Sequence, residues 1–377
     1  MGAFFCSNFK GDRVEKMFGL FGGGKKKDFD VSVNGGAAKF TVKAGDNLLK
    51  AALDNGVAWP HDCRVGSCGS CKAIVKSGKI KALTDFSYVL DGDQLKSGTV
   101  LACQTALKSD LDIEVELGEE IATEMLSIDG TISQVVDLTH DIKELVVSTD
   151  TAFTRAMLAG QYAEIEVEGV SDPRSYSFAK APSNENDGEF TFYIRHVPGG
   201  AFTDWLFAED RTGTAIKLNA PFGQFYHRPD DSMMVCMAGG SGMSAIKSLL
   251  EACVNDQVER DCIYLFGART LKDLYCADEM EQIKSSWNKN FKFDYIPVLS
   301  ADQDSDWTGP KGYVTDYFKQ AYLDNSSMNL TNAQGYLCGP PAMIDSAIEL
   351  LKSGGIQEES IYYDKFLDAS SIPGGRK

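Results

Sequence analysis

The chain has 377 residues, more than one hydrophobic core usually serves, so two or three domains are expected. Its 43% hydrophobic and 24% charged residues are typical of a globular protein and exclude a disordered one. The net charge of -17 argues against nucleic acid as a partner, because phosphate binding requires a basic surface. It suits docking on a basic protein, or solubility alone.

The cysteine content bears on the cellular compartment. Ten cysteines, in a chain whose basic N-terminus precedes no apolar signal core, indicate a reducing cytoplasm. No apolar run in the sequence reaches the roughly 18 residues that span a bilayer. In a reducing compartment, closely spaced thiols favour metal or redox chemistry over disulfides. We therefore expect a cytoplasmic protein whose clustered cysteines serve such chemistry.

Residues 1–27 form an N-terminal extension in which phenylalanines are interleaved with basic residues. It ends in GGGKKK, which is typical of a flexible hinge. Two interpretations stay open. The extension is either a frayed tail or a weak amphipathic contact with a membrane surface or a partner protein.

Residues 28–120 alternate in polarity as short strands do. Strands are expected at 29–35 and 38–45, a helix at 47–56 and a closing strand at 111–117. A cysteine-rich loop follows the helix. This order predicts a small α+β domain.

The remaining two segments differ in rhythm. Residues 125–229 hold short strands separated by Gly, Pro and Asp turns, which favours an antiparallel barrel. In residues 230–377, buried strands alternate with helices, as in a parallel sheet wound with helices. The barrel strands are expected at 132–138, 143–149, 162–167 and 190–197, the later strands at 233–238, 262–268, 293–299 and 335–339, and the helices at 243–253, 277–286, 315–323 and 341–353.

The cysteine loop follows the pattern C-x4-C-x2-C. Its members are Cys63, Cys68 and Cys71, and Cys103 supplies a fourth thiol later in the chain. This spacing and number are typical of a plant-type [2Fe–2S] cluster, which needs four thiolates. A zinc site more often shows two C-x2-C pairs, but zinc and unligated thiols stay open as alternatives.

Two short motifs in the second segment indicate an anion site. RSYS, at 174–177, begins with an arginine whose guanidinium offers a permanent positive charge. GGAFT, at 199–203, opens an expected helix, where glycine backbone and the helix dipole favour a phosphate. Each motif alone is also typical of an ordinary strand end or helix cap.

Three strand ends in the third segment carry glycine. AGGSGMSAI, at 238–246, joins a strand to a helix, and Gly267 and Gly339 end two further strands. Ligands bind at this edge of open α/β sheets, so the three turns predict a nucleotide site. The sequence lacks the G-x-G-x-x-G fingerprint of a standard dinucleotide fold. Arg269 suits the 2′-phosphate of NADPH, whereas the following Asp273 does not.

The order of these motifs resembles the reductase components of bacterial multicomponent oxygenases. The resemblance covers residues 28 to about 370 and rests on the cysteine pattern, RxYS with GGxxT, and GGSG…CGPP. The segments FGARTLKDLYCADEM and YYDKF are similar to phenol hydroxylase and toluene monooxygenase reductases, and ALTDFSYVL to xylene monooxygenase reductases. The resemblance implies a β-grasp ferredoxin domain, an FAD-binding β-barrel and an NAD-binding α/β domain of the ferredoxin-NADP-reductase type.

The resemblance also implies roles for single residues. Ser177 would lie near the reactive nitrogen of the flavin, Cys338 at the nicotinamide and Phe366 over the isoalloxazine. Asp364 departs from the glutamate usual before the terminal phenylalanine, and Ser244 with Ala245 from the commoner Ala-Pro. The residues implied to bind FAD are Arg174, Ser175, Tyr176, Ser177, Gly199, Gly200, Ala201, Thr203, Gly223, Phe225 and Phe366; those implied to face the dinucleotide are Gly239, Gly240, Gly242, Ser244, Arg269, Cys338 and Gly339.

Electron counting gives the expected order of transfer. NADH delivers two electrons as a hydride and a [2Fe–2S] cluster accepts one, so the flavin must lie between them. The resemblance implies NADH as donor and an oxygenase or hydroxylase on another chain as partner. A self-contained reductase acting directly on a small molecule is the alternative. A flavin–iron–sulfur redox sensor is disfavoured, because no segment resembles an output domain.

Overall fold

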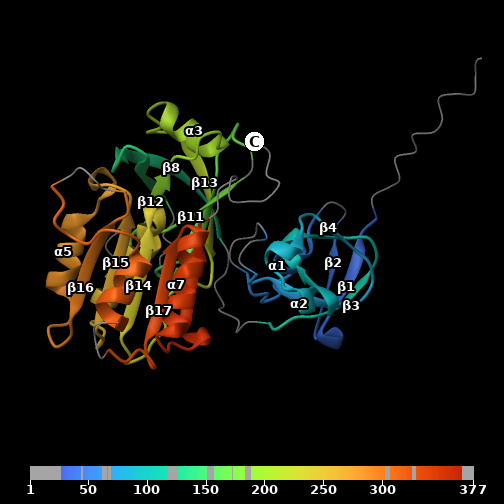
Figure 1. Ribbon diagram of the computed structural model, residues 1–377. Coiled ribbons are helices and arrows are strands. Elements are labelled where there is room, and N and C mark those ends of the chain that lie inside the picture. Colours follow the sequence, from blue (N-terminus) through green and yellow to red (C-terminus); the bar gives the residue numbers. More distant parts are fainter. Residues whose placement is uncertain are drawn as a thin grey trace, which may run out of the picture.

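The computed structural model describes residues 27–43, 46–61, 66, 69–117, 126–150, 157–171, 173–182, 188–301, 306–324 and 328–366. The chain forms three successive units, each built around its own sheet (Figure 1). Within these ranges no helix combines the length and apolarity needed to cross a membrane. All but the last residue of the N-terminal extension lies outside the described residues.

The first unit is a mixed sheet crossed by one helix. Its strand order is β2-β1-β7-β3-β5, in which β1 and β7 run parallel and the other pairs antiparallel. Helix α1 begins where the Asn47 side chain accepts from the Lys50 amide, and its apolar face lies in the unit's core. The elements are β1 (Phe29–Val33), β2 (Ala38–Val42), α1 (Leu48–Asp54), β3 (Lys72–Ser77), β4 (Ile80–Ala82), α2 (Gly92–Lys96), β5 (Thr99–Leu101), β6 (Thr105–Leu107) and β7 (Leu111–Glu114).

The second unit is a near-closed antiparallel barrel, as the sequence predicts. Its strand order is β11-β10-β13-β8-β9-β12, and a bridge between Phe178 and Phe192 brings the two edges together. Alternating apolar residues fill the interior. The elements are β8 (Leu126–Asp137), β9 (Ile142–Thr149), β10 (Tyr162–Glu166), β11 (Arg174–Ser177), β12 (Glu189–Arg195), α3 (Ala201–Ala208) and β13 (Ala215–Phe222).

The third unit is a parallel sheet of order β16-β15-β14-β17-β18. Helices α4 and α5 cover one face, and α6 and α7 the other. The strand order reverses at β14, so a crevice opens at the carboxyl ends of β14, β15 and β17. The elements are β14 (Met234–Gly239), α4 (Met243–Asn255), β15 (Cys262–Ala268), α5 (Ala277–Ser286), β16 (Phe293–Leu299), α6 (Val314–Phe318), β17 (Gln334–Gly339), α7 (Pro341–Ser353) and β18 (Ile361–Lys365).

Several details differ from the sequence-based expectation. Strand β13 was not expected, since AIKLNAPF contains Lys, Asn and Pro, which are poor strand formers. Strands β5, β6 and β18 and the short helix α2 were not expected either. The helix expected at 315–323 is a short α-helix that continues as a π-helical segment, Lys319–Asp324.

The barrel and the parallel-sheet unit share one apolar core. Ile142, Ala179, Tyr193 and Phe225 of the barrel unit are buried in the same cluster as side chains of α4 and β14. A continuous core resists relative motion, because separating the units would expose apolar surface. The two units therefore present their candidate sites at a fixed mutual distance.

Candidate cofactor-binding sites

The structure brings two of the four predicted cysteine ligands together. Cys71 precedes β3 and Cys103 lies in the helical turn Ala102–Gln104 after β5, so antiparallel pairing of these strands makes the two neighbours. Their Sγ atoms are 3.3 Å apart, and both residues are buried. Two thiolates on one tetrahedral ion, with bonds of about 2.3 Å, lie about 3.8 Å apart. The pair therefore fits ligation of a single metal ion of a cluster.

The cysteine loop itself is described only at Gly66 and from Gly69 onward; Cys63 and Cys68 lie outside the described residues. Both glycines have positive φ, +84° and +81°, which favours glycine over other residues. A Cβ at Gly66 would lie 2.5 Å from Cγ of Gln104, beside the Cys103 turn. Gly66 thus lies against that turn.

The predicted flavin residues of β11 lie at the edge of the barrel. Ser177 is buried, whereas Arg174 is half-buried and Ser175 exposed. The ring of Tyr176 packs on Phe202 of α3, with centroids 5.3 Å apart. Burial raises the pKa of the Tyr176 hydroxyl, which therefore stays neutral. The strand can accordingly present a neutral aromatic ring and one fixed cation to a ligand.

The GGAFT turn leads into α3, with Gly200 as its N-cap and Ala201 as its first residue. The Thr203 hydroxyl donates to the Val197 carbonyl over 2.9 Å, which holds the turn. The amide of Gly199 donates to the carboxylate of Asp204 over 3.0 Å. An acidic side chain of the chain itself therefore already uses one of the amides expected to meet a phosphate.

Two further predicted FAD residues, Gly223 and Phe225, are buried where the barrel meets the parallel-sheet unit. The Gly223 carbonyl accepts a hydrogen bond from Gln161 over 3.1 Å. Phe366 is half-buried against the shared core, and its amide donates to the Gly339 carbonyl over 2.8 Å. This bond joins the last described residue to the turn after β17.

The glycine turns after β14 and β17 pack backbone to backbone. A Cβ at Gly242 would lie 2.3 Å from the Cys338 carbonyl oxygen, and one at Gly339 would lie 2.9 Å from that of Gly239. No side chain fits at either position without displacing backbone. The Ser244 hydroxyl donates to the Ser241 carbonyl over 2.8 Å and so closes the turn. Burial raises the pKa of the Cys338 thiol.

A cavity of about 660 Å³ lies at this edge of the sheet. Gly239, Gly240 and Arg269, all predicted dinucleotide residues, line it. Asp273, which the sequence analysis weighed against NADPH, also lines it. Asp141, Arg195 and Tyr313 line it too, and the sequence did not single them out. Of these three, only Tyr313 could have been noticed in the sequence, as an aromatic residue next to a glycine, and its side chain is 69% exposed.

Arg195 brings a cation from the barrel into this cavity. Its Nε donates to Oδ2 of Asp141 over 2.9 Å, and its Nη1 lies 3.5 Å from the position of a Cβ at Gly240. Burial alone would raise the pKa of Asp141, but the hydrogen bond and charge of Arg195 outweigh it and lower that pKa. The guanidinium is thus held beside the glycine turn.

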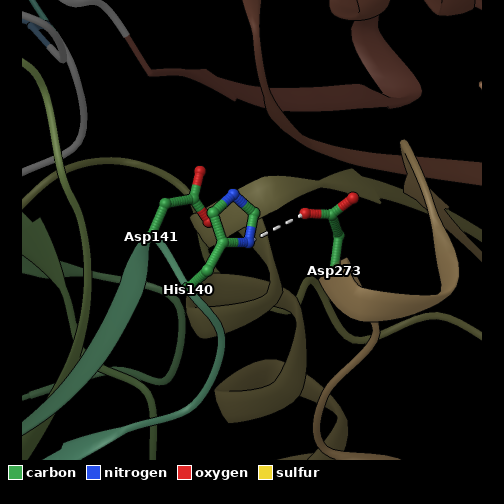
Figure 2. Close-up of side chains that lie close together, drawn as sticks. All are labelled: His140, Asp141 and Asp273. Carbon is green, nitrogen blue, oxygen red and sulfur yellow. Dashed lines mark ion pairs between the residues drawn. The ribbon is translucent and has the colours of Figure 1, made fainter.

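A second contact crosses the same boundary (Figure 2). His140 of the barrel points its Nδ1 toward Oδ1 of Asp273, 3.5 Å away, while Asp141 lies on the far side of the ring. The three side chains are close enough to hold a metal ion. Asp141 is already paired with Arg195, and Asp273 accepts from the Thr270 amide over 2.7 Å. We therefore interpret the group as a contact between the two units.

Three family models match successive parts of the chain. The 2Fe-2S iron-sulfur cluster binding domain matches residues 31–108, the oxidoreductase FAD-binding domain 129–227 and the oxidoreductase NAD-binding domain 234–349. The xylene/toluene monooxygenase electron transfer component XylA of Pseudomonas putida is 42% identical over 355 residues, 93% of this chain and 97% of that protein. The chain belongs to the reductase components of multicomponent oxygenases.

Further similarities agree with this family. The phenol 2-monooxygenase reductase component DmpP of Pseudomonas sp. (strain CF600) is 31% identical to the reductase, over 92% of this chain and 96% of that protein. The crystal structure of the Amycolatopsis cytochrome P450 reductase GcoB matches with a TM-score of 0.74 and 28% identity, over 90% of this chain and 98% of that one.

The predicted cofactors and activity are confirmed. The reductase is an oxidoreductase that moves electrons from NADH through FAD and a [2Fe–2S] cluster to a separate oxygenase component. Direct reduction of a small molecule, the alternative that the sequence left open, is the less supported of the two.

Proposed function

We propose that the reductase serves a hydroxylase whose substrate is an alkyl-substituted aromatic hydrocarbon of the xylene or toluene kind. The observation that carries this proposal is the 42% identity to a xylene/toluene monooxygenase component, against 31% to a phenol 2-monooxygenase component over almost the same share of the chain. A shared partner surface is expected to persist between reductases that serve related hydroxylases.

We infer the following division of labour among the residues. FAD, when bound, accepts a hydride and releases its electrons one at a time. Ser177 and Tyr176 would border the flavin ring, and Arg174 would offset the negative charge of the FAD phosphates. Phe366, whose amide donates to Gly339 at the end of β17, would cover the ring and exclude water from it. The four cysteines hold the cluster on a separate unit.

The structure supports a role for Arg195 in orienting NADH. Its guanidinium, fixed by Asp141, is the barrel's cation at the glycine turn, where the pyrophosphate of a dinucleotide would lie. Asp273 also lines the cavity, and its charge would repel the additional phosphate of NADPH. Arg195 would therefore stabilise the bound dinucleotide from across the boundary between the units.

We predict that Arg195→Ala weakens NADH binding about ten-fold, the value expected for one charge-assisted hydrogen bond that is partly exposed to water. Anaerobic titration of flavin reduction against NADH concentration measures the dissociation constant. Arg211→Ala is the matched control, because Arg211 belongs to the same unit but packs on Trp205 outside the cavity. An unchanged dissociation constant in the Arg195 variant would exclude this role.

Reconstitution tests the proposed function. The full-length reductase is combined with purified xylene-type and phenol-type hydroxylases, and hydroxylated product is counted per NADH oxidised. We expect coupled turnover with the xylene-type hydroxylase to exceed that with the phenol-type at least about ten-fold, since a mismatched docking surface costs at least about 1.4 kcal/mol. Equal turnover, or a preference for the phenol-type enzyme, contradicts the proposal.

Removal of residues 1–27 in the same assay tests whether this extension contacts a membrane or the partner protein. A loss of coupled turnover with unchanged reduction of cytochrome c supports such a contact.

A further inference from the structure

Helix α4 places a charged pair inside the boundary between the barrel and the parallel-sheet unit. Lys247 and Glu251 stand one helical turn apart, and the side chain of Lys247 is only 2% exposed. Its ammonium group donates to the Glu251 carboxylate and to the carbonyl of Ala179, 3.1 Å away. The second carboxylate oxygen accepts from the amide of Ala181 over 2.9 Å. The pair thus binds the barrel's backbone at two points.

Apolar packing does not require these charges. The neighbouring α4 residues Ile246, Leu249 and Leu250 are fully buried, so the helix has ample apolar surface for docking. Burying an ammonium and a carboxylate costs free energy that their mutual attraction often only offsets. The pair instead fixes the orientation of α4 relative to the barrel. Hydrogen bonds to the Ala179 carbonyl and the Ala181 amide fix one orientation, whereas apolar contact tolerates sliding.

The two segments that the pair joins lie beside the predicted sites. Ala179 and Ala181 follow Ser177, the residue placed near the reactive part of the flavin, within the same short segment. Helix α4 begins at Met243, directly after the glycine turn that lines the cavity. The Lys247–Glu251 pair therefore connects the strand end of the predicted flavin site to the helix that follows the predicted dinucleotide turn.

We propose that Lys247 and Glu251 are positioning residues that set the geometry of hydride transfer between the dinucleotide and the flavin. Neither Lys247 nor Glu251 is among the described residues that line the cavity, so both act through the segments that they hold. This inference rests on the proposed placement of Ser177 and of the glycine turn. Because a displacement of about 1 Å can slow a positioned reaction about 100-fold, a small change of orientation is enough to be measured.

The experiment uses the full-length, FAD-loaded protein and separates positioning from stability. Lys247→Met leaves the half-buried Glu251 carboxylate without its cation and should lower the melting temperature. In the double variant Lys247→Met/Glu251→Leu, an apolar pair replaces the ionic one, which commonly restores stability. Four quantities are measured for each variant. They are the limiting rate of anaerobic flavin reduction at saturating NADH, the dissociation constant of NADH, the melting temperature and the rate of deuterium exchange in residues 178–182.

We expect both variants to reduce flavin about ten-fold to 100-fold more slowly than the wild type, with NADH affinity unchanged within about two-fold. The melting temperature should recover in the double variant while the rate does not. Exchange of the Ala181 amide should be faster in the double variant, which lacks the Glu251 carboxylate that accepts from it. Lys50→Met is the matched control, because Lys50 pairs with Asp54 at the same helical spacing on the exposed face of α1 in the first unit. It should reduce flavin at the wild-type rate.

A double variant that regains both stability and rate would overturn the proposal and leave the pair a purely structural role. Should the methionine variants lose FAD, Glu251→Gln keeps an oxygen for the Ala181 amide and removes only the charge. Its limiting rate should fall at least about three-fold, and a wild-type rate there also overturns the proposal. A wild-type protein that NADH does not reduce would instead contradict the proposed function. The exchange of the Ala181 amide would then still decide whether the pair holds the two units together.

Discussion

Replacing Cys103 by serine should abolish electron delivery to the hydroxylase while NADH still reduces the flavin. The Sγ atoms of Cys71 and Cys103 lie 3.3 Å apart in the core of the first unit, so both are placed to bind one metal ion. A serine hydroxyl is a far weaker ligand than a thiolate, and the cluster should be lost or labile. The predicted flavin residues belong to the barrel, except for Phe366 of the third unit, and neither of these units depends on this loop.

The measurement combines metal content with two electron acceptors. Wild-type protein should contain about two irons and two labile sulfides per chain, and the variant far less. Ferricyanide reduction, which needs only the flavin, should persist, whereas coupled hydroxylation should fall below about 1% of the wild-type value, as expected for an obligatory carrier. Cys253→Ser is the control, because Cys253 is a buried thiol of α4 far along the chain from the loop. Full coupled turnover in the Cys103 variant would refute the path through the cluster.

The sequence predicts those sites whose parts are local in the chain. The thiol pattern from Cys63 to Cys71 is local, and Cys103 was found because a plant-type cluster needs a fourth ligand. The glycine turns after β14, β15 and β17 were found because parallel strands end at one edge of a sheet. The strands and helices around them were likewise strongly periodic, and the structure confirms the barrel and the wound parallel sheet.

The contributions that were missed are those that one unit makes to another. Arg195 and Asp141 reach the cavity only because the barrel packs against β14, and nothing in their local sequence shows that contact. From the sequence alone, Lys247 would be expected to face solvent on an amphipathic helix. In the structure its ammonium group instead donates to the Ala179 carbonyl of the barrel unit. Strand β13 was missed for a similar reason, since pairing with β8 and β10 overrides the weak strand preference of its residues.

Gly242→Ala should disable reduction by NADH without releasing FAD. At Gly242 the backbone has φ −61°, which alanine adopts without strain, so the substitution tests steric contact alone. The added Cβ would lie 2.3 Å from the Cys338 carbonyl oxygen and 2.6 Å from its carbon. These are backbone atoms of β17, which pairs with β14 and β18 and cannot move aside as a flexible side chain would. The turn after β14 must therefore shift, and with it the start of α4.

We expect the ratio of flavin-reduction rate to NADH dissociation constant to fall at least about 100-fold, which corresponds to about 2.7 kcal/mol, within the range of core overpacking. FAD and iron content should stay at wild-type values, because all the predicted FAD residues except Phe366, and all four predicted cluster cysteines, lie in other units. Gly92→Ala is the control, since a Cβ there meets nothing within 4 Å. Wild-type reduction kinetics in Gly242→Ala would show that the two turns need not touch. The dinucleotide site would then have to be sought away from the crevice between β14 and β17. A loss of rate without loss of affinity would instead indicate that the shifted turn acts through α4, on which Lys247 and Glu251 stand.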